Sequence, residues 1–339
     1  MYKKIVLSVA LAMSVMCAAG SSHAGSMLEF DMDGLGGAGP NARNDFVGFD
    51  WFPGNTLADG GNQAVSNFVS KVGSTTFDLF YQARISNTGA MFGTAGTLTY
   101  GIGGSSAPAG KEFTIVAGFR EKVTGIAPDG TATFDFVAGE PNFLEVYFDD
   151  VNANDLAGTG FNNGTLILSA NVTGITSSNF KPDPKVVSRL DGFGVDNYNG
   201  LETIKGGGGT NLTAAVSFVN PDFFYGASMA GLNVTFKLDS PFEGTQGVPF
   251  DVVNPSARFV KAAGGVAPVL DGAGLYVNDL VSPSLGAVNG SFTGTGGPDV
   301  QFKSDANQSF QITAVPEPAS LAIWALGFAF LPTLRTRRA

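Results

Sequence analysis

Apolar and polar residues alternate along several short segments in the middle of the chain. In residues 111–123, apolar side chains occupy every second position from Phe113 to Phe119. The same pattern or an aromatic-rich variant of it occurs in residues 77–85, 131–137, 143–148, 165–172, 212–219, 232–238, 300–302 and 310–312. A period of two places one face of a strand in a core and the other towards solvent, so these segments predict half-buried β-strands.

Turn residues separate the predicted strands. Pro128-Asp129-Gly130 and Asn162-Asn163-Gly164 are typical turn sequences, and the chain holds 47 Gly and 29 Phe in 339 residues. Between the two ends of the chain, no window longer than about ten residues has a convincing helical period. We expect an all-β fold, a mostly antiparallel sandwich or barrel with long Gly-rich loops.

The predicted β-rich region spans residues 25–305, as one large sandwich or two packed ones. Within it, residues 181–185 and the four glycines 206–209 are expected to be loops. Residues 306–314 are expected to form a short spacer.

The N-terminal segment has the three parts of a signal peptide. Lys3 and Lys4 precede an apolar run, residues 5–19, and Ser22 and Ala24 supply the small residues before a cleavage site. Residues 1–24 would then be removed during export. Cys17 is an alternative lipidation site, but Met16 stands where a small residue is needed.

The C-terminal segment, residues 315–339, combines a rigid motif, an apolar run and a basic end. Pro316, Glu317 and Pro318 precede the uncharged residues 319–334, which are followed by arginines. As a helix, the uncharged run would span roughly 24 Å, slightly less than a bilayer core of ~30 Å. The three arginines that would hold the tail on the cytoplasmic side are Arg335, Arg337 and Arg338. A plain anchor or a buried terminal element is the simpler alternative.

This order of motif, apolar helix and arginines resembles the PEP-CTERM sorting signal of Gram-negative bacteria. The resemblance implies Sec export, signal peptidase cleavage and a transient inner-membrane anchor formed by the C-terminal transmembrane helix. It also implies that an exosortase recognises the tail, after which the protein reaches the cell surface or the extracellular matrix. Proteins with this signal typically accompany exopolysaccharide production in flocs and biofilms.

Signal peptide cleavage would remove the only cysteine, Cys17, and the only histidine, His23. The mature chain would then have no disulfide, no Cys or His zinc ligand and no imidazole for nucleophilic catalysis. Carboxylate chemistry, Ser-Lys chemistry and oxygen-ligand metals remain open.

Charge also limits the partners. Without Lys3, Lys4 and the three terminal arginines, the chain keeps 14 basic and 29 acidic residues, a net charge of −15. Such a chain repels nucleic acid and anionic membrane surfaces, so we expect no nucleic-acid partner. Divalent cations could bridge it to acidic polysaccharide, although simple solubility explains the charge equally well.

Two aromatic residues are candidate glycan contacts. Trp51 and Phe52 lie in the block from Asp50 to Asn55, and the alternative to a sugar-stacking platform is an aromatic-lined turn at the end of a sandwich. Residues 49–58, together with residues 80–84, 154–161 and 163–168, resemble the flocculation-associated PEP-CTERM proteins. That resemblance implies cell aggregation through the polysaccharide matrix and brings no catalytic residues.

One loop is a candidate calcium site. Its oxygen-bearing side chains are Asp149, Asp150, Asn152, Asn154 and Asp155. Positions 1, 3 and 5 from Asp150 match an EF-hand loop, but Asp155 replaces the required Gly, Phe161 replaces the final Glu, and strands flank the loop. An Asx-rich turn is the alternative, and residues 31–34 and 191–199 are weaker candidates. No cofactor is required by the sequence.

The pattern as a whole predicts an exported matrix protein that promotes cell aggregation and is not an enzyme. The alternative is a secreted carbohydrate-binding module or a glycan-active enzyme that uses two carboxylates.

Overall fold

The computed structural model describes the β-rich part of the chain. The described residues are 28–36, 42–85, 90–92, 108–155, 158–189, 202–225, 233–240, 259–260, 280–282 and 300–311. All of them belong to one compact unit, Met27–Gln311. The predicted signal peptide and C-terminal sorting helix lie outside the described residues.

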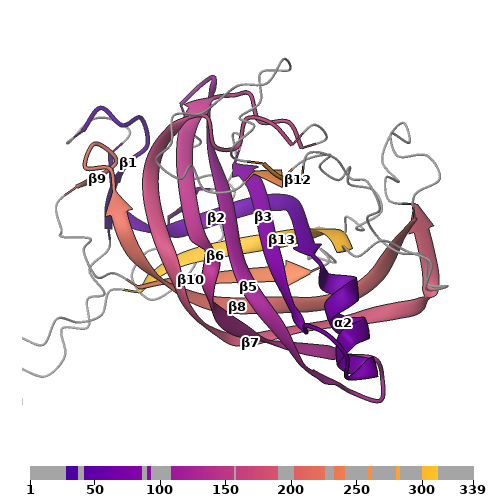
Figure 1. Ribbon diagram of the computed structural model, residues 1–339. Coiled ribbons are helices and arrows are strands. Elements are labelled where there is room, and N and C mark those ends of the chain that lie inside the picture. The colour runs from indigo at the N-terminus through magenta and orange to yellow at the C-terminus, as the bar shows by residue number, and fades with distance from the viewer. Residues whose placement is uncertain are drawn as a thin grey trace, which may run out of the picture. The chain divides into compact units, whose positions relative to one another are not determined.

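Most described residues are in antiparallel strands, so the all-β prediction is confirmed (Figure 1). The strands are β1 (Leu28–Asp31), β2 (Ala42–Asp59), β3 (Thr76–Ile85), β4 (Ala90–Phe92), β5 (Lys111–Ile126), β6 (Ala132–Asp150), β7 (Thr165–Arg189), β8 (Glu202–Val219), β9 (Phe224–Tyr225), β10 (Asn233–Ser240), β11 (Phe259–Val260), β12 (Leu280–Ser282) and β13 (Val300–Gln311).

Eight strands form a sheet that closes on itself. The order is β2-β3-β5-β6-β7-β8-β10-β13, and β13 pairs with β10 on one side and with β2 on the other. Of the two predicted architectures, this closure corresponds to the barrel, and one continuous sheet replaces the pair of packed sandwiches. Short strands β1, β4 and β9 extend the sheet from β2, and β11 pairs with β12.

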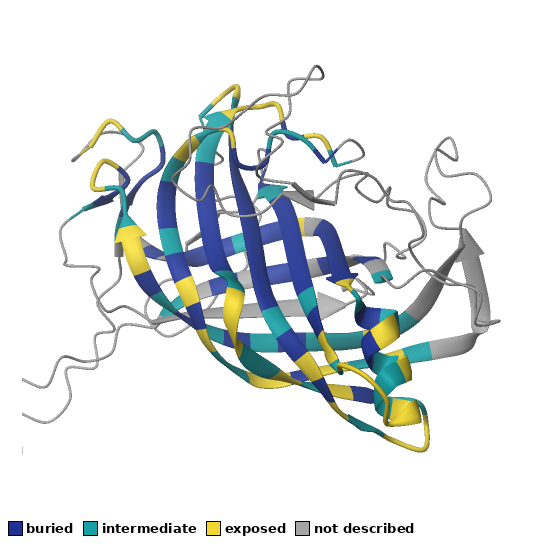
Figure 2. Ribbon diagram, in the orientation of Figure 1, coloured by how far each residue is buried: buried dark blue, intermediate teal, exposed yellow. Residues whose placement is uncertain are grey.

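Aromatic side chains fill much of the interior. Phe30 stacks on Phe46 with ring centroids 4.4 Å apart, and Phe113 contacts Phe148 at 5.1 Å. Tyr81 on β3 pairs with Ala117 on β5, and the side chains of directly paired residues point to the same, inner face of the sheet. The central parts of these strands are buried, as Figure 2 shows.

Several segments expected to be irregular are strands. Residues 181–182 and 206–207 pair across β7 and β8, so the predicted loops are wrong there. Gly208 is needed because a Cβ would collide with the carbonyl oxygen of Asn179. Residues 306–311 of the predicted spacer are the second half of β13. The Asp50–Asn55 block lies within β2 and is not a turn.

One helix was not predicted. It is α2 (Gly61–Ser70), which buries Gly61 and Ala64 and ends at Lys71 in a left-handed conformation with φ 58°. The turn predicted at Pro128–Gly130 is confirmed, because it joins β5 to β6 and Gly130 has φ 87°.

Candidate functional site

The predicted processing residues lie outside the described part of the chain. They are Ser22 and Ala24 at the N-terminal end, and Pro316, Glu317, Pro318, Arg335, Arg337 and Arg338 at the C-terminal end. Their roles stay predictions. The strand nearest to the sorting motif is β13, which ends at Gln311.

The first acidic residues of the candidate calcium loop have protein partners. Asp149 accepts hydrogen bonds from the backbone N–H of Asp150 and from Nδ2 of Asn152, at 2.8 and 2.9 Å. The Asp150 carboxylate forms an exposed ion pair with Lys111, at 2.7 Å. A cation would therefore compete with the Lys111 ammonium for Asp150.

The rest of that loop is also engaged. Asn154 pairs through its backbone with Thr159, at 2.9 Å, and Asp155 forms an ion pair with Arg84 at 3.5 Å. Within the described residues, no group of three or more Asp, Glu, His or Cys side chains could hold a metal ion. Asp31 accepts from the backbone N–H of Asp33, and Asp33 from that of Leu35, as in the alternative Asx turns.

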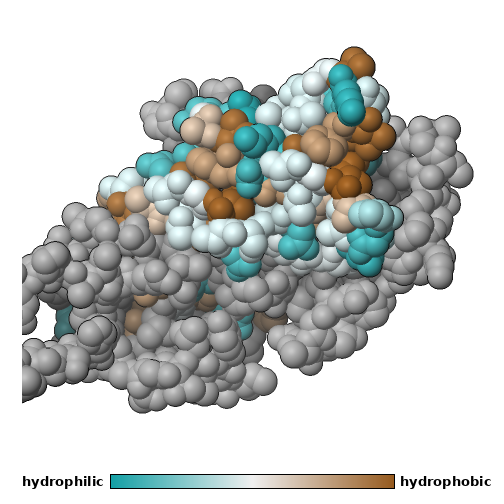
Figure 3. All heavy atoms as spheres, turned by 90° about the horizontal axis from the view of Figure 1, so that it is seen from below, coloured by the Kyte–Doolittle hydropathy of each residue, from teal (hydrophilic) through white to brown (hydrophobic). Residues whose placement is uncertain are grey.

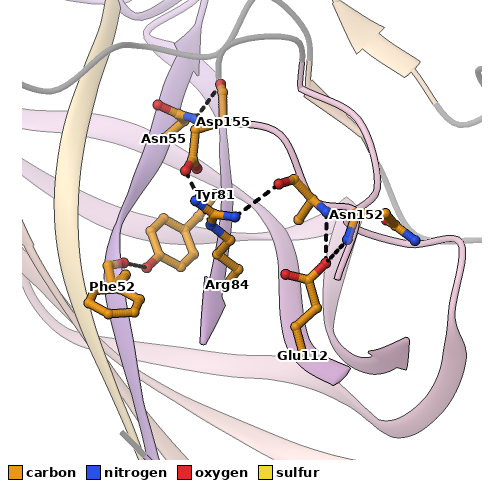
Figure 4. A network of polar contacts seen from close by, with 8 residues as sticks. Phe52, Asn55, Tyr81, Arg84, Glu112, Asn152 and Asp155 are labelled. Atoms are coloured by element: carbon orange, nitrogen blue, oxygen red, sulfur yellow. Dashed lines mark hydrogen bonds and ion pairs between the residues drawn. The ribbon is translucent and has the colours of Figure 1, made fainter. Parts of the chain in front are cut away.

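Residues 151–155 and 158–164 belong to the loop between β6 and β7, which is hydrogen-bonded to side chains on the outer face of β2, β3 and β5 (Figure 4). Glu112 lies at its centre: the carboxylate is fully buried and accepts the backbone N–H groups of Asn152 and Ala153, both at 2.7 Å. Arg84 donates to the carbonyl of Ala153 and Asn55 to the carbonyl of Asp155, both at 3.1 Å. These bonds fix the loop that carries three of the five candidate calcium ligands.

The structure separates the two candidate glycan contacts. Trp51 is only 1% exposed and packs against Phe49 inside the sheet, with centroids 5.1 Å apart. It cannot stack on a sugar at the outer surface, so that part of the prediction is wrong. Phe52 is 38% exposed, because neighbouring residues on a strand face opposite sides. Its carbonyl accepts a hydrogen bond from the Tyr81 hydroxyl, at 3.4 Å.

A buried carboxylate on the inner face was missed by the sequence analysis. Glu121 is 1% exposed, pairs with Phe77 on β3 and with Phe136 on β6, and its Oε1 has no hydrogen-bond partner. Burial raises the pKa of Glu121 to about 7, although a hydrogen bond with Ser178 opposes the shift. Ser178 in turn shares a hydrogen bond of 2.8 Å with Thr210.

A second carboxyl group with a raised pKa points the other way. Burial raises the pKa of Asp50 to about 6. Asp50 lies between the inward-facing residues Phe49 and Trp51 on β2, so alternation turns it outward, whereas Glu121 faces inward. The two groups therefore do not form the pair across a shared cleft that a two-carboxylate glycosidase needs.

Among the described residues, no helix has the length and apolar character needed to cross a membrane. Comparisons with known proteins give no match: no family model, no characterised protein and no solved structure is significantly similar to the chain.

Proposed function

We propose that this chain is an exported bacterial matrix protein, sorted by an exosortase, that promotes cell aggregation together with exopolysaccharide. One observation carries the proposal: the described strands begin at Leu28 and end at Gln311, between the two predicted processing segments. Cleavage after Ala24 and near Pro316 would therefore remove none of these strands. The folded unit can be released whole.

The chemistry of the mature chain fits an extracellular scaffold. Its net charge of −15 and its lack of cysteine and histidine suit a soluble, redox-insensitive protein among acidic polymers. The closed sheet leaves β2 and β13 paired with each other, so neither end of the eight-strand array is a free edge. Free edges promote uncontrolled strand addition, and closure removes this hazard in a crowded matrix.

The glycan-active enzyme is the second candidate and has less support. It needs two carboxylates about 5–10 Å apart across a sugar. The carboxyl groups with pKa values raised to about 7 and about 6 face opposite sides of the sheet. A carbohydrate-binding role without catalysis remains compatible with matrix function.

Mass spectrometry of the protein collected outside the cells tests the sorting step. We expect no peptide from residues 322–339 in released material, and we expect Pro316→Ala with Pro318→Ala to hold the chain at the inner membrane. Thr313→Ala, next to the motif, is the matched control and should be released normally. An intact tail on released protein would contradict the proposal.

Deletion of the gene tests the biological role. Cells without the protein should flocculate less and retain less polysaccharide, and the wild-type gene should restore both. Unchanged flocculation in a strain that normally releases the protein would contradict a role in aggregation.

A further inference from the structure

The outward side of β7 and β8 differs in charge from the rest of the chain. Residues 165–180 and 206–219 contain no Asp, Glu, Lys or Arg, although the mature chain carries 29 acidic and 14 basic residues. We call the outward-facing residues of these two segments the uncharged face. In Figure 1, β7 and β8 run along the lower side, and the view from below in Figure 3 shows broad pale areas of residues with intermediate hydropathy between hydrophilic (teal) and hydrophobic (brown) groups.

Side chains on the uncharged face form a cross-strand hydrogen-bond ladder. The Thr173 and Thr213 hydroxyls lie 3.1 Å apart, and Asn211 donates to the Ser177 hydroxyl at 2.8 Å. Ser217 bonds to the carbonyl and the hydroxyl of Ser169, at 3.1 and 3.3 Å. These bonds fix the rotamers of exposed polar groups, so a partner would lose little side-chain entropy on binding them.

An aromatic ring lies at one end of this ladder. Phe218 is 43% exposed and pairs with Ser169, next to a register shift that also leaves Ser217 exposed. Further along β7, Asn171 is exposed as well. An exposed ring beside hydroxyl and amide groups offers both a stacking surface and hydrogen-bond partners.

We propose that the uncharged face binds an extended, polyhydroxylated polymer, a strand of extracellular polysaccharide that lies along β7 and β8. The inference rests on the proposed function and assigns it a surface. Hydroxyl and amide side chains can donate to and accept from sugar hydroxyls. The absence of charge in these two segments means that an acidic polysaccharide meets no repulsion there, whereas the acidic remainder of the chain disfavours it.

A peptide strand is a poorer occupant. β7 lies between β6 and β8, and β8 lies between β7 and β10, so neither is an outermost strand of the sheet. Between residues 170 and 179, where β7 is not paired with β6, the Asn142 side chain bonds to the backbone N–H and carbonyl of Val172. Strand addition depends on backbone groups at an edge. A partner at this face must therefore bind mainly to side chains, and a polysaccharide can do so through its hydroxyl groups.

Affinity electrophoresis of the purified protein tests the proposal. The gel contains polysaccharide isolated from the matrix of the producing cells, and parallel gels contain neutral dextran or acidic alginate. We expect the matrix polysaccharide to retard the wild-type protein, and Thr173→Val, Thr213→Val and Phe218→Ala together to weaken binding at least tenfold. Retardation by dextran or by alginate would identify a neutral or an acidic polymer as sufficient.

Thr124→Val with Thr133→Val is the matched control. These two exposed hydroxyls also lie 3.1 Å apart, but on β5 and β6 near the exposed Lys122 and Asp135. The control should bind like the wild type, and circular dichroism should show both variants folded. Should the triple variant lose its fold, Asn171→Asp alone, which adds one exposed charge, should still weaken binding to the acidic polymer.

Three results would overturn the inference: no retardation of the wild type by matrix polysaccharide, equal binding by the folded triple variant, or equal loss in the control. These results differ from a failure of the proposed function. If the protein is released without its tail and its deletion reduces flocculation, but the variants still bind, only the assigned surface is wrong.

Discussion

The buried carboxyl group of Glu121 should make the stability of the protein depend on pH. Its pKa is about 7 in the folded protein, against 4.5 as its ordinary value. The neutral form is therefore favoured by folding. The protonated carboxyl group therefore adds to the free energy of unfolding below pH 4.5, and this contribution is lost as the pH rises through about 7. At ~1.4 kcal/mol per pKa unit, the loss amounts to roughly 3 kcal/mol of the free energy of unfolding.

Glu121→Gln isolates this effect, because the amide keeps the shape of the side chain and cannot ionise. Urea unfolding at pH 4.5 and pH 8.5 would be followed by circular dichroism for both proteins. We expect the wild type to lose roughly 3 kcal/mol more than the variant between the two pH values. Asp50 also has a raised pKa, so the comparison with the variant, and not the wild-type slope alone, carries the test.

Glu140→Gln is the matched control, since Glu140 is exposed on β6. It should leave the pH dependence of the wild type unchanged. If Glu121→Gln and the wild type lose the same free energy between the two pH values, then Glu121 is not buried as a neutral acid and the reasoning fails.

Three further predictions concern the packing of the sheet and the loop. Gly54→Ala should cost about 1–3 kcal/mol in urea unfolding, because its Cβ would lie 2.5 Å from both the Ala83 Cβ and the Gln82 carbonyl oxygen. Gly207→Ala, with no atom within 4 Å, should cost no more than ~0.5 kcal/mol, and equal costs would contradict the close approach. Glu112→Ala should cost about 2–4 kcal/mol and speed proteolysis within residues 151–164, because two backbone N–H groups lose their acceptor; cleavage as slow as in Asp149→Ala would argue against this role. Since Lys111 and Arg84 already pair with Asp150 and Asp155, we expect the same Tm in millimolar calcium and in chelator; a Tm increase with calcium that Asn152→Ala abolishes would support the calcium site instead.

Local sequence patterns predicted the strands better than their partners. Alternation in residues 111–123 predicted β5, and the turn at 128–130 predicted the β5–β6 hairpin. The same alternation, continued from Phe113 and Phe119, places Glu121 on the inner face, so this buried acid had a signal in the sequence. Likewise, Phe49 and Trp51 share a face because they are two residues apart, which identifies Trp51 as a core residue.

Other features have no local signal. Pairing of β13 with β2 joins segments that are far apart in sequence, and the polar residues between Phe302 and Phe310 made the strand resemble a spacer. The glycines of β8 resembled a loop, yet they allow a close approach to β7 that larger residues would prevent. The bonds from Glu112 to the 151–164 loop depend on tertiary contact and cannot be inferred from either segment alone.

The closure between β2 and β13 also determines when the fold can be completed. Thr56 on β2 donates to Ser304 on β13 with a bond of 2.8 Å, across a separation of 248 residues. During synthesis, which proceeds from the N-terminus, the sheet therefore stays open until β13, the last described strand, has been made. Until then, β2 and β10 are edges that can join strands of other chains. A chain that stops before residue 300 lacks β13, so it should keep both edges exposed and should aggregate more readily than the full chain.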